Sequence, residues 1–334
     1  MTELLVCPPF IHRQEGCPQS ATWGCRTNRY RSIITFMHPD SDGFITRAAA
    51  LTAGYTDSEF TRLAVKGNIR KIAKGIYYPS EKYDALTPTG IHRIRSIAGA
   101  RRHEGHAISH VSAAVMHGLT MWNTDLSRVH LTTDRATGGR KNSDVHIHTA
   151  GLDALSLTHI GAAPVTSVAR TLVDTARIVD LDHAVVIGDS ALHKHVITPA
   201  ELTDMLAQSS RLHNIAAARR AVARMNGLSE SAGESLSRLR MDQYGIPEPV
   251  LQHRIADLDF RVDFFWPQFR IIGEFDGRAK YGGLAENLAR EKEREDALRD
   301  EGYQVFRWVW KDLWNFSEVY MRFEKARARA TVTR

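Results

Sequence analysis

Three carboxylates within residues 261–280 are the side chains of this sequence best suited to do chemistry. Asp263 lies in one alternating stretch, and Glu274 and Asp276 lie in a second, with Pro267 at the turn between them. Strand side chains alternate with period two, so an antiparallel hairpin would place Asp263 across from Glu274 or Asp276. Carboxylates held so close repel each other unless they share a cation or a proton. Mg²⁺ prefers one or two carboxylates with water and phosphate oxygens, so the sequence predicts a Mg²⁺ site.

The same alternation predicts which neighbours share a face with these acids. Arg261 and Phe265 fall on the face of Asp263. A structural alternative is that the two later acids form surface ion pairs with Arg261 and Arg278. Asp263 has no such simple alternative, because its neighbours are apolar and a buried carboxylate without a partner is costly.

The bulk composition is that of a globular protein with more than one domain. The chain has 334 residues, 43% hydrophobic and 25% charged, a length that predicts two or three domains. It contains no apolar run of the ~20 residues that a membrane helix needs and no signal-peptide pattern, which predicts a cytoplasmic protein without a membrane partner. The net charge of +6 favours a polyanionic partner, although only weakly unless the charge clusters.

The first 40 residues differ from the rest of the chain. They hold all three cysteines, Cys7, Cys17 and Cys25, none in a C-x-x-C pair, which argues against a disulfide framework and a standard zinc site. The segment before Met37 has no helical or strand periodicity. We therefore interpret residues 1–40 as disordered, or as an upstream extension of a chain whose working start is Met37.

Residues 41–80 predict a winged helix-turn-helix. Ile45–Gly54 is Ala-rich and ends on a glycine suited to a helix C-cap, and a second helix begins at Thr56 with Glu59 completing a capping box. The following stretch indicates two short strands with a turn near Lys74. Two helices and a hairpin in this order are typical of a DNA-binding module.

Basic residues concentrate in this module. Six Lys or Arg residues stand against two acids between residues 43 and 80. The side chains that we expect to contact DNA bases and phosphates are Arg62 and Lys66 on the second helix and Arg70, Lys71 and Lys74 in the wing. The alternative is a solvated basic face on a small helical domain.

Residues 81–227 predict a mixed α/β region of helices and one hairpin. A helix covers Pro88–Arg102, and two alternating stretches flank the basic loop Arg135–Lys141. His130, His146 and His148 fall on one face of this hairpin and form a potential metal constellation. A polar sheet face is the favoured interpretation, since no acidic or cysteine partner is nearby.

Two helix starts in this region have clear signals. Ser167 is the N-cap of a helix with an Arg170–Asp174 pair, which is worth only a few tenths of a kcal/mol at a surface. Pro199 follows Thr198 at the first position of another helix. A domain boundary follows at 227/228, and residues 228–320 then run in the order helix, strands, hairpin, charged helix, strand. Residues 321–334 are predicted to form a basic tail.

This order, together with several short motifs, resembles the restriction-endonuclease-like fold. The resemblance is closer to a bacterial family of uncharacterised domains related to very-short-patch-repair endonucleases, and it covers about residues 228–316. The motifs that carry it are Glu234, Arg261-Val262-Asp263-Phe264, Glu274-Phe275-Asp276-Gly277, Arg294-Glu295-Asp296 and Arg307-Trp308.

The front of the chain, about residues 44–149, resembles the antitoxin of abortive-infection-type toxin–antitoxin systems. This second resemblance rests on the winged helix, on the segment Ser109–Ala114 and on His117-Gly118-Leu119. Together the two resemblances imply an α/β (α+β multidomain) protein. Its parts would be an N-terminal winged helix-turn-helix, a mixed α/β middle region and a C-terminal restriction-endonuclease-like α/β domain.

The nuclease resemblance assigns roles to individual residues. It implies that Asp263 and Glu274 hold Mg²⁺, with the Phe275 carbonyl as a further ligand, for metal-assisted hydrolysis of DNA phosphodiester bonds. The family has a lysine where this chain has Asp276, and an acid there does not neutralise phosphate charge. The replacement base would then be Lys280, Lys292 or Arg278.

Glu234 has two readings of equal weight. The nuclease resemblance implies that it holds a metal-bound water. Its spacing from Ser231 also fits a capping box at the start of a helix.

Two functions follow as hypotheses. The first is a DNA-binding protein with a Mg²⁺-dependent endonuclease domain. The second is a non-catalytic, antitoxin-like transcriptional regulator whose nuclease fold is inactive and binds DNA or a partner, such as a cognate toxin.

Overall fold

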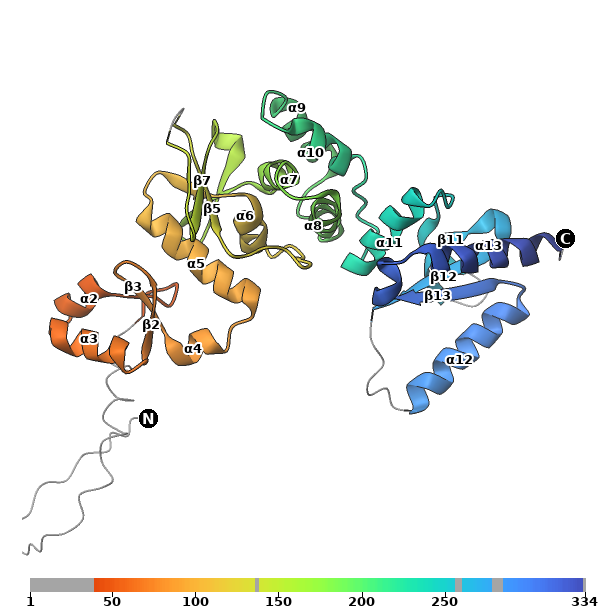
Figure 1. The fold of residues 1–334 in the computed structure, drawn as a ribbon, viewed down its shortest axis with the longest axis horizontal. Coiled ribbons are helices and arrows are strands. Elements are labelled where there is room, and N and C mark those ends of the chain that lie inside the picture. Colours follow the sequence, from red (N-terminus) through yellow and green to blue (C-terminus); the bar gives the residue numbers. More distant parts are fainter. Residues whose placement is uncertain (1–38, 136–137, 256–259, 278–284, 333–334) are drawn as a thin grey trace, which may run out of the picture. The chain divides into compact units, whose positions relative to one another are not determined.

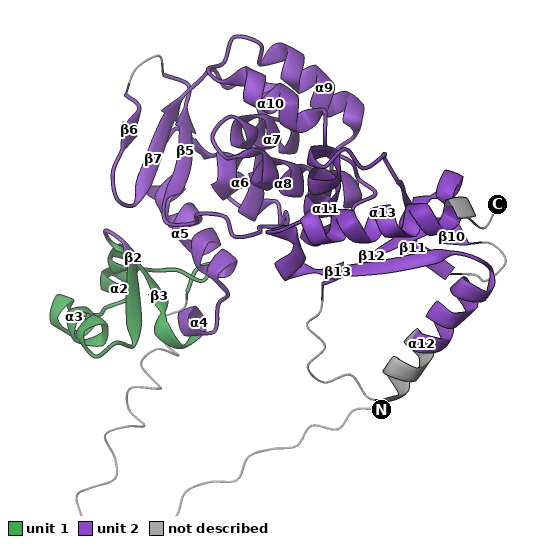
Figure 2. Cartoon of the chain, turned by 45° about the vertical axis from the view of Figure 1, so that its right-hand side comes forward, with its two compact units in different colours: residues 1–71, 75–81 green, residues 72–74, 82–334 purple. Residues whose placement is uncertain are grey.

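The computed structural model describes residues 39–135, 138–255, 260–277 and 285–332 and shows an α/β protein (Figure 1). The chain forms two compact units, residues 1–71 with 75–81 and residues 72–74 with 82–334 (Figure 2). The first unit ends at residue 81, and the second unit continues through residue 227. The predicted domain boundaries stay predictions. The segment before Met37 and its three cysteines lie outside the described residues.

The two helices and the hairpin predicted for residues 41–80 are present, and all of them except residues 72–74 of the hairpin belong to the first unit. The elements are β1 (Ile45–Thr46), α2 (Arg47–Thr52), α3 (Asp57–Val65), β2 (Ile69–Ala73) and β3 (Ile76–Pro79). The strands form a sheet in the order β1-β3-β2. The capping box of Thr56 and Glu59 is present, and Gly75 takes a positive φ of 79° at the hairpin turn. The first helix begins later than predicted, because Ile45 and Thr46 pair with β3.

A six-stranded sheet in the order β6-β7-β5-β4-β9-β8 occupies the middle region. Its strands are β4 (His106–Ile108), β5 (Val129–Thr133), β6 (Arg140–Lys141), β7 (Val145–Thr149), β8 (Leu157–Ile160) and β9 (Ala163–Thr166). The predicted hairpin of the two His-bearing stretches is wrong, because β5 and β7 pair in parallel. The connection between them carries β6, which pairs antiparallel with β7 and lets the chain return in the same direction.

The helices of the middle region are α4 (Ser80–Asp84), α5 (Pro88–Arg102), α6 (His110–Met116), α7 (Val168–Ala176), α8 (Leu181–His193), α9 (Pro199–Gln208) and α10 (Ile215–Val222). The helices from α6 to α10 share one apolar core. The predicted starts at Ser167 and Thr198 are confirmed by side-chain caps. The Arg170–Asp174 pair is not at the surface, since both side chains are buried and their atoms lie 2.7 Å apart. A buried pair is costly to break, so its structural weight exceeds the predicted surface value.

The last part of the chain contains a four-stranded sheet in the order β10-β11-β12-β13. Its elements are α11 (Ala232–Gln243), β10 (Val250–Ile255), β11 (Phe260–Trp266), β12 (Ile271–Asp276), α12 (Ala285–Asp300), β13 (Gln304–Val309) and α13 (Ser317–Val332). The hairpin of β11 and β12 is antiparallel, as predicted, whereas β13 joins β12 in parallel. The predicted order of helix, strands, hairpin, helix and strand is confirmed.

Helices cover both faces of this sheet. On one face Phe264 and Trp308 pack with Leu236 of α11 and Phe323 of α13, and on the other Leu298 of α12 packs against Phe265. The predicted basic tail from residue 321 is therefore wrong, because α13 crosses that boundary with a buried apolar side. Among the described residues, no helix has both the length and the apolar composition needed to cross a membrane.

The contact between α11 and β12 depends on a glycine. A Cβ at Gly233 would lie 1.9 Å from Cε1 of the Phe275 ring, so only a residue without a side chain lets the helix sit this close. Phe275 directly follows Glu274. The packing of α11 therefore sets the end of the strand that carries two of the three acids.

We expect Gly233→Ala to lower the free energy of unfolding by about 1–3 kcal/mol, because the helix or the ring must move. Gly151→Ala is the control, since the nearest heavy atom to a Cβ there is 3.9 Å away. Urea denaturation followed by tryptophan fluorescence measures the difference. Equal stability of the two variants would contradict this account of the packing.

Candidate functional site

Asp263 and Glu274 lie side by side on neighbouring strands. The antiparallel register pairs Phe264 with Gly273. Asp263 precedes Phe264 and Glu274 follows Gly273, so the two acids come next to each other at the end of this pairing. The backbone N–H of Phe275 donates a hydrogen bond of 2.9 Å to Oδ2 of Asp263. This contact fixes the Asp263 carboxylate against the end of β12.

The environment of Asp263 disfavours its charge. Burial raises the pKa of this carboxyl to about 6, and the negative charges of Glu234 and Glu274 act in the same direction. The hydrogen bond from Phe275 and the positive charge of Arg294 oppose the rise. Asp263, Glu234 and Glu274 therefore form a partly buried acidic cluster, which makes this position a candidate functional site.

The strand is irregular at Asp263. Val262 and Phe265 pack in the same apolar cluster, although strict alternation would put them on opposite faces. Opposite Asp263 in the register of β10 and β11, Gln252 has a positive φ of 50°. The predicted common face of Arg261, Asp263 and Phe265 is therefore wrong, because the strand does not alternate regularly between Val262 and Phe265.

Glu274 is buried and paired with two arginines. Its Oε1 lies 2.6 Å from Nη2 of Arg294 on α12, and its Oε2 lies 3.0 Å from Nη2 of Arg307 on β13. The parallel register places Arg307 directly beside Glu274. Arg307 also approaches Glu295 at 3.5 Å. The positive charge beside the acids thus comes from arginines, which suit planar contacts with carboxylate and phosphate groups.

Glu234 has a full set of hydrogen bonds at the start of α11. Its Oε1 accepts from the Ser231 hydroxyl at 2.7 Å, and its Oε2 accepts from the Glu230 N–H at 2.9 Å and from the Gln252 amide at 2.8 Å. Ser231 in turn caps the Glu234 N–H. The N-cap at Ser231 is present, but the Glu234 carboxylate accepts from the N–H of Glu230 and not of Ser231, so the predicted capping box is incomplete. The negative charge of Glu234 also acts on Asp263.

The remaining predicted residues lie at or beyond the edge of this cluster. Asp276 is half-buried at the last position of β12, and Lys292 is exposed on α12, two positions before Arg294. Arg261 pairs with Glu230 at 2.7 Å rather than with the later acids. Lys280 and Arg278 lie outside the described residues.

Sequence reasoning did not assign roles to Arg294 and Arg307. Both stand in motifs that carry the family resemblance, and this position in a motif is the sequence feature that could have indicated a role. Their contact with Glu274 depends on α12 packing against the sheet and on parallel pairing of β13, which no local pattern reveals.

The five residues expected to contact DNA are all exposed. Arg62 and Lys66 lie on the last turn of α3 and just beyond it, and Arg70, Lys71 and Lys74 lie along the hairpin of β2 and β3. Phe60 and Leu63 hold the opposite side of α3 in the core of the first unit. The basic residues therefore face solvent from a well-packed helix and hairpin.

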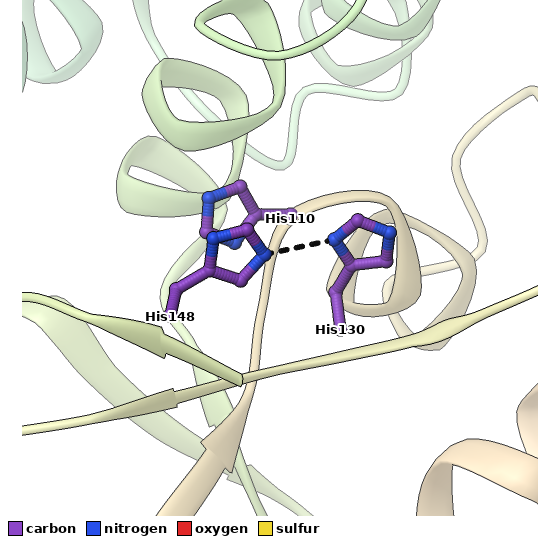
Figure 3. Close-up of side chains that lie close together, drawn as sticks. All are labelled: His110, His130 and His148. Carbon is purple, nitrogen blue, oxygen red and sulfur yellow. Dashed lines mark hydrogen bonds between the residues drawn. The ribbon is translucent and has the colours of Figure 1, made fainter. Parts of the chain in front are cut away.

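The histidines of the middle region also come together, in a different set from the one predicted. His130 and His148 lie within ligand distance of each other and of His110, which sequence analysis did not include (Figure 3). His146 lies nearby, with its ring tilted against that of His148 and the two centroids 3.8 Å apart. His110 was missed because it is the first residue of α6, far in sequence from β5 and β7.

Comparison with known proteins gives two curated relatives, the uncharacterized proteins MT2308 and Rv2248 of Mycobacterium tuberculosis. Each is 30% identical over 205 residues, which are 60% of this chain and 73% of the relative. The chain belongs to the family of these two mycobacterial proteins. No family model matches it. Among solved structures, the crystal structure of the RV2827C protein from Mycobacterium tuberculosis has a TM-score of 0.37 at 15% identity and covers 60% of this chain and 82% of that chain.

The pKa of Asp263 predicts a pH-dependent stability difference in EDTA. Because this pKa is about 6 in the folded state and 3.8 for an ordinary aspartate, the folded protein loses stability as pH rises through that window. Asp263→Asn should therefore be more stable than the parent at neutral pH, by on the order of 1–3 kcal/mol, with no difference near pH 4. Urea denaturation across this pH range measures the effect.

Asp300→Asn is the control for this series, since Asp300 is an exposed acid at the end of α12. It should track the parent at every pH. A destabilised Asp263→Asn variant at neutral pH would contradict the charge-crowded description of the site.

Proposed function

We propose that this chain is a DNA-binding protein whose C-terminal domain is a Mg²⁺-dependent endonuclease. The observation that carries the proposal is the placement of Asp263 and Glu274 on adjacent strands with the Arg294 guanidinium against them. The order α11, three strands, α12 and β13 supports it, because it matches the restriction-endonuclease-like order that the sequence motifs imply.

The donor set fits a hard divalent cation. Burial raises the pKa of Asp263, the negative charges of Glu234 and Glu274 add to the rise, and a bound cation would offset both effects. Asp263 and Glu274 would hold Mg²⁺, which would activate water and offset charge on the phosphate. The Phe275 N–H orients Asp263 for this task.

Arg294 provides the positive charge that Asp276 does not. Its guanidinium reaches Glu274 from α12, and it lowers the energy of the Asp263 charge as well. With a cation held by Asp263 and Glu274, the Arg294 guanidinium would be available to a phosphate oxygen, for which its planar donors are suited. Arg294 therefore takes the place of Lys280 and Lys292 in the proposal.

The first unit supports the DNA-binding part of the proposal. Its two helices and hairpin are arranged in the order of a winged helix-turn-helix, and Arg62, Lys66, Arg70, Lys71 and Lys74 are all exposed. Clustered basic side chains on one small module supply the phosphate contacts from which DNA affinity largely comes.

A second candidate function is the non-catalytic regulator, with DNA and a cognate toxin or other protein as partners. The observation that favours it is the double pairing of Glu274 with Arg294 and Arg307, which already neutralises the carboxylate without a metal. With Asp276 in the position of the family lysine, such a site would be a stable ion-pair network and not a catalytic one.

Nicking of supercoiled plasmid in millimolar Mg²⁺ tests the nuclease. Asp263→Asn and Glu274→Gln should each lower the rate by at least about 100-fold, because each removes a metal ligand. Asp300→Asn should keep the parental rate. Equal rates in all four proteins would identify a contaminating nuclease and reject the assignment.

Calorimetric titration with Mn²⁺ separates the two candidate functions. Binding that disappears in Asp263→Asn supports the enzyme. A parent protein that binds DNA but neither binds Mn²⁺ nor nicks plasmid supports the regulator.

DNA binding by the first unit has its own test. Arg62→Ala should weaken duplex binding for every sequence and reduce the slope of log K against log salt by about 1, as expected for one lost phosphate contact. Arg211→Ala, an exposed arginine of the second unit, is the matched control and should leave the slope unchanged. Equal losses in the two variants would show that only net charge matters.

A further inference from the structure

We propose that His110, His130 and His148 form a binding site for a divalent transition-metal ion of the Zn²⁺ class. The site lies in the middle region of the second unit and uses none of the acidic residues described above. It is therefore independent of the proposed nuclease function.

Three neighbouring strands bring the histidines together. The parallel register of β5 and β7 sets His130 beside His146 and Thr132 beside His148, so His130 and His148 are two positions apart along one face. β4 pairs with β5 on its other side, and His110 follows two residues after β4 ends. His110 has a positive φ of 52°, a conformation that only a strongly determined surrounding maintains in a residue with a side chain.

The distances suit one small cation. One ring nitrogen from each histidine lies within 4.8 Å of the other two, and Nδ1 of His130 is 3.0 Å from Nε2 of His148 (Figure 3). Nitrogens about 2.0–2.1 Å from a tetrahedral Zn²⁺ are a little over 3 Å apart. The His110 ring stacks on His148 with centroids 3.8 Å apart, so a small rotation of this ring completes the set.

Each of the three rings can offer one ring nitrogen to a metal. One of the two nitrogens that face each other in the His130–His148 hydrogen bond carries the proton, and a bound metal ion would take the place of that proton. Three such nitrogens in one place form a ligand set, and His₃ sites with an open fourth position are typical of zinc.

Two hydroxyl groups hold the His110 ring in place. The Ser109 hydroxyl lies 2.9 Å from Nδ1 of His110, and the Thr132 hydroxyl donates to Ser109 at 2.7 Å. Serine and threonine are buried here. Such outer contacts fix ring orientation and are the usual companions of metal-binding histidines.

An open pocket provides an entry path for the ion. It has a volume of about 430 Å³, and its lining includes His130 of the three proposed ligands. Arg128 and Lys141 in the lining are balanced by Asp125 and Asp180. Water in this pocket would complete the coordination.

Metal content and Co²⁺ spectra of the full chain test the site. The background protein carries serine at Cys7, Cys17 and Cys25, so that thiolate does not compete for the metal. After EDTA treatment and desalting, this protein should take up one equivalent of Zn²⁺. With Co²⁺ it should show a visible d–d band without the near-ultraviolet thiolate band, and Zn²⁺ should displace the Co²⁺.

His130→Gln and His148→Gln, each neutral and of similar size, should weaken Zn²⁺ binding by at least about 10-fold. His159→Gln is the matched control, because this histidine is exposed on β8 of the same sheet. Circular dichroism confirms that each variant is folded. If a variant does not fold, the Co²⁺ spectrum of the background protein alone decides whether the histidine site binds a metal ion. Absence of that spectrum, or unchanged Zn²⁺ affinity in a folded variant, overturns the proposal.

Discussion

Compensation of buried negative charge at the end of β11 and β12 is the interaction on which the C-terminal domain depends. Asp263 and Glu274 are brought together by strand pairing, and Glu234 is held close by its cap hydrogen bonds at the start of α11. None of these three acids can move away from the others without breaking a strand pair or a helix start. The charges must therefore be neutralised by other groups, and the elements around the sheet provide them.

Two sources of positive charge are available, and they have different consequences. Arg294 and Arg307 neutralise Glu274 from α12 and β13, and the pKa of Asp263 stays raised because burial outweighs its hydrogen bond from Phe275. A divalent cation would satisfy Asp263 and Glu274 together and release a guanidinium for the DNA backbone. In the nuclease the acids would hold a divalent cation, whereas in the regulator they would stay paired with arginines.

Patterns confined to a few residues predicted the local structure. The capping box at Thr56, the helix start at Thr198 and the hairpin turn near Lys74 follow from neighbouring residues alone, and they appear where expected. The antiparallel pairing that joins Asp263 to Glu274 was also predictable, since a short turn allows little else. These features needed no knowledge of the tertiary structure.

Contacts between distant segments were not predictable in this way. The parallel pairing of β5 and β7 replaced an expected hairpin, because a long connection leaves strand direction open. The arrival of Arg294 beside Glu274, and of His110 beside His148, depends on how whole elements pack. Local alternation also gave the wrong face for Asp263, where the strand is distorted opposite Gln252. Irregular positions of this kind often carry function.

The most direct measurement is anomalous diffraction at the manganese edge from crystals grown with Mn²⁺, a substitute for Mg²⁺ that can be located without ambiguity. The account predicts one anomalous peak bridging the carboxylates of Asp263 and Glu274, with the Arg294 guanidinium displaced from Glu274. Glu274 still paired with both arginines, and no peak between the two acids at saturating Mn²⁺, would contradict it.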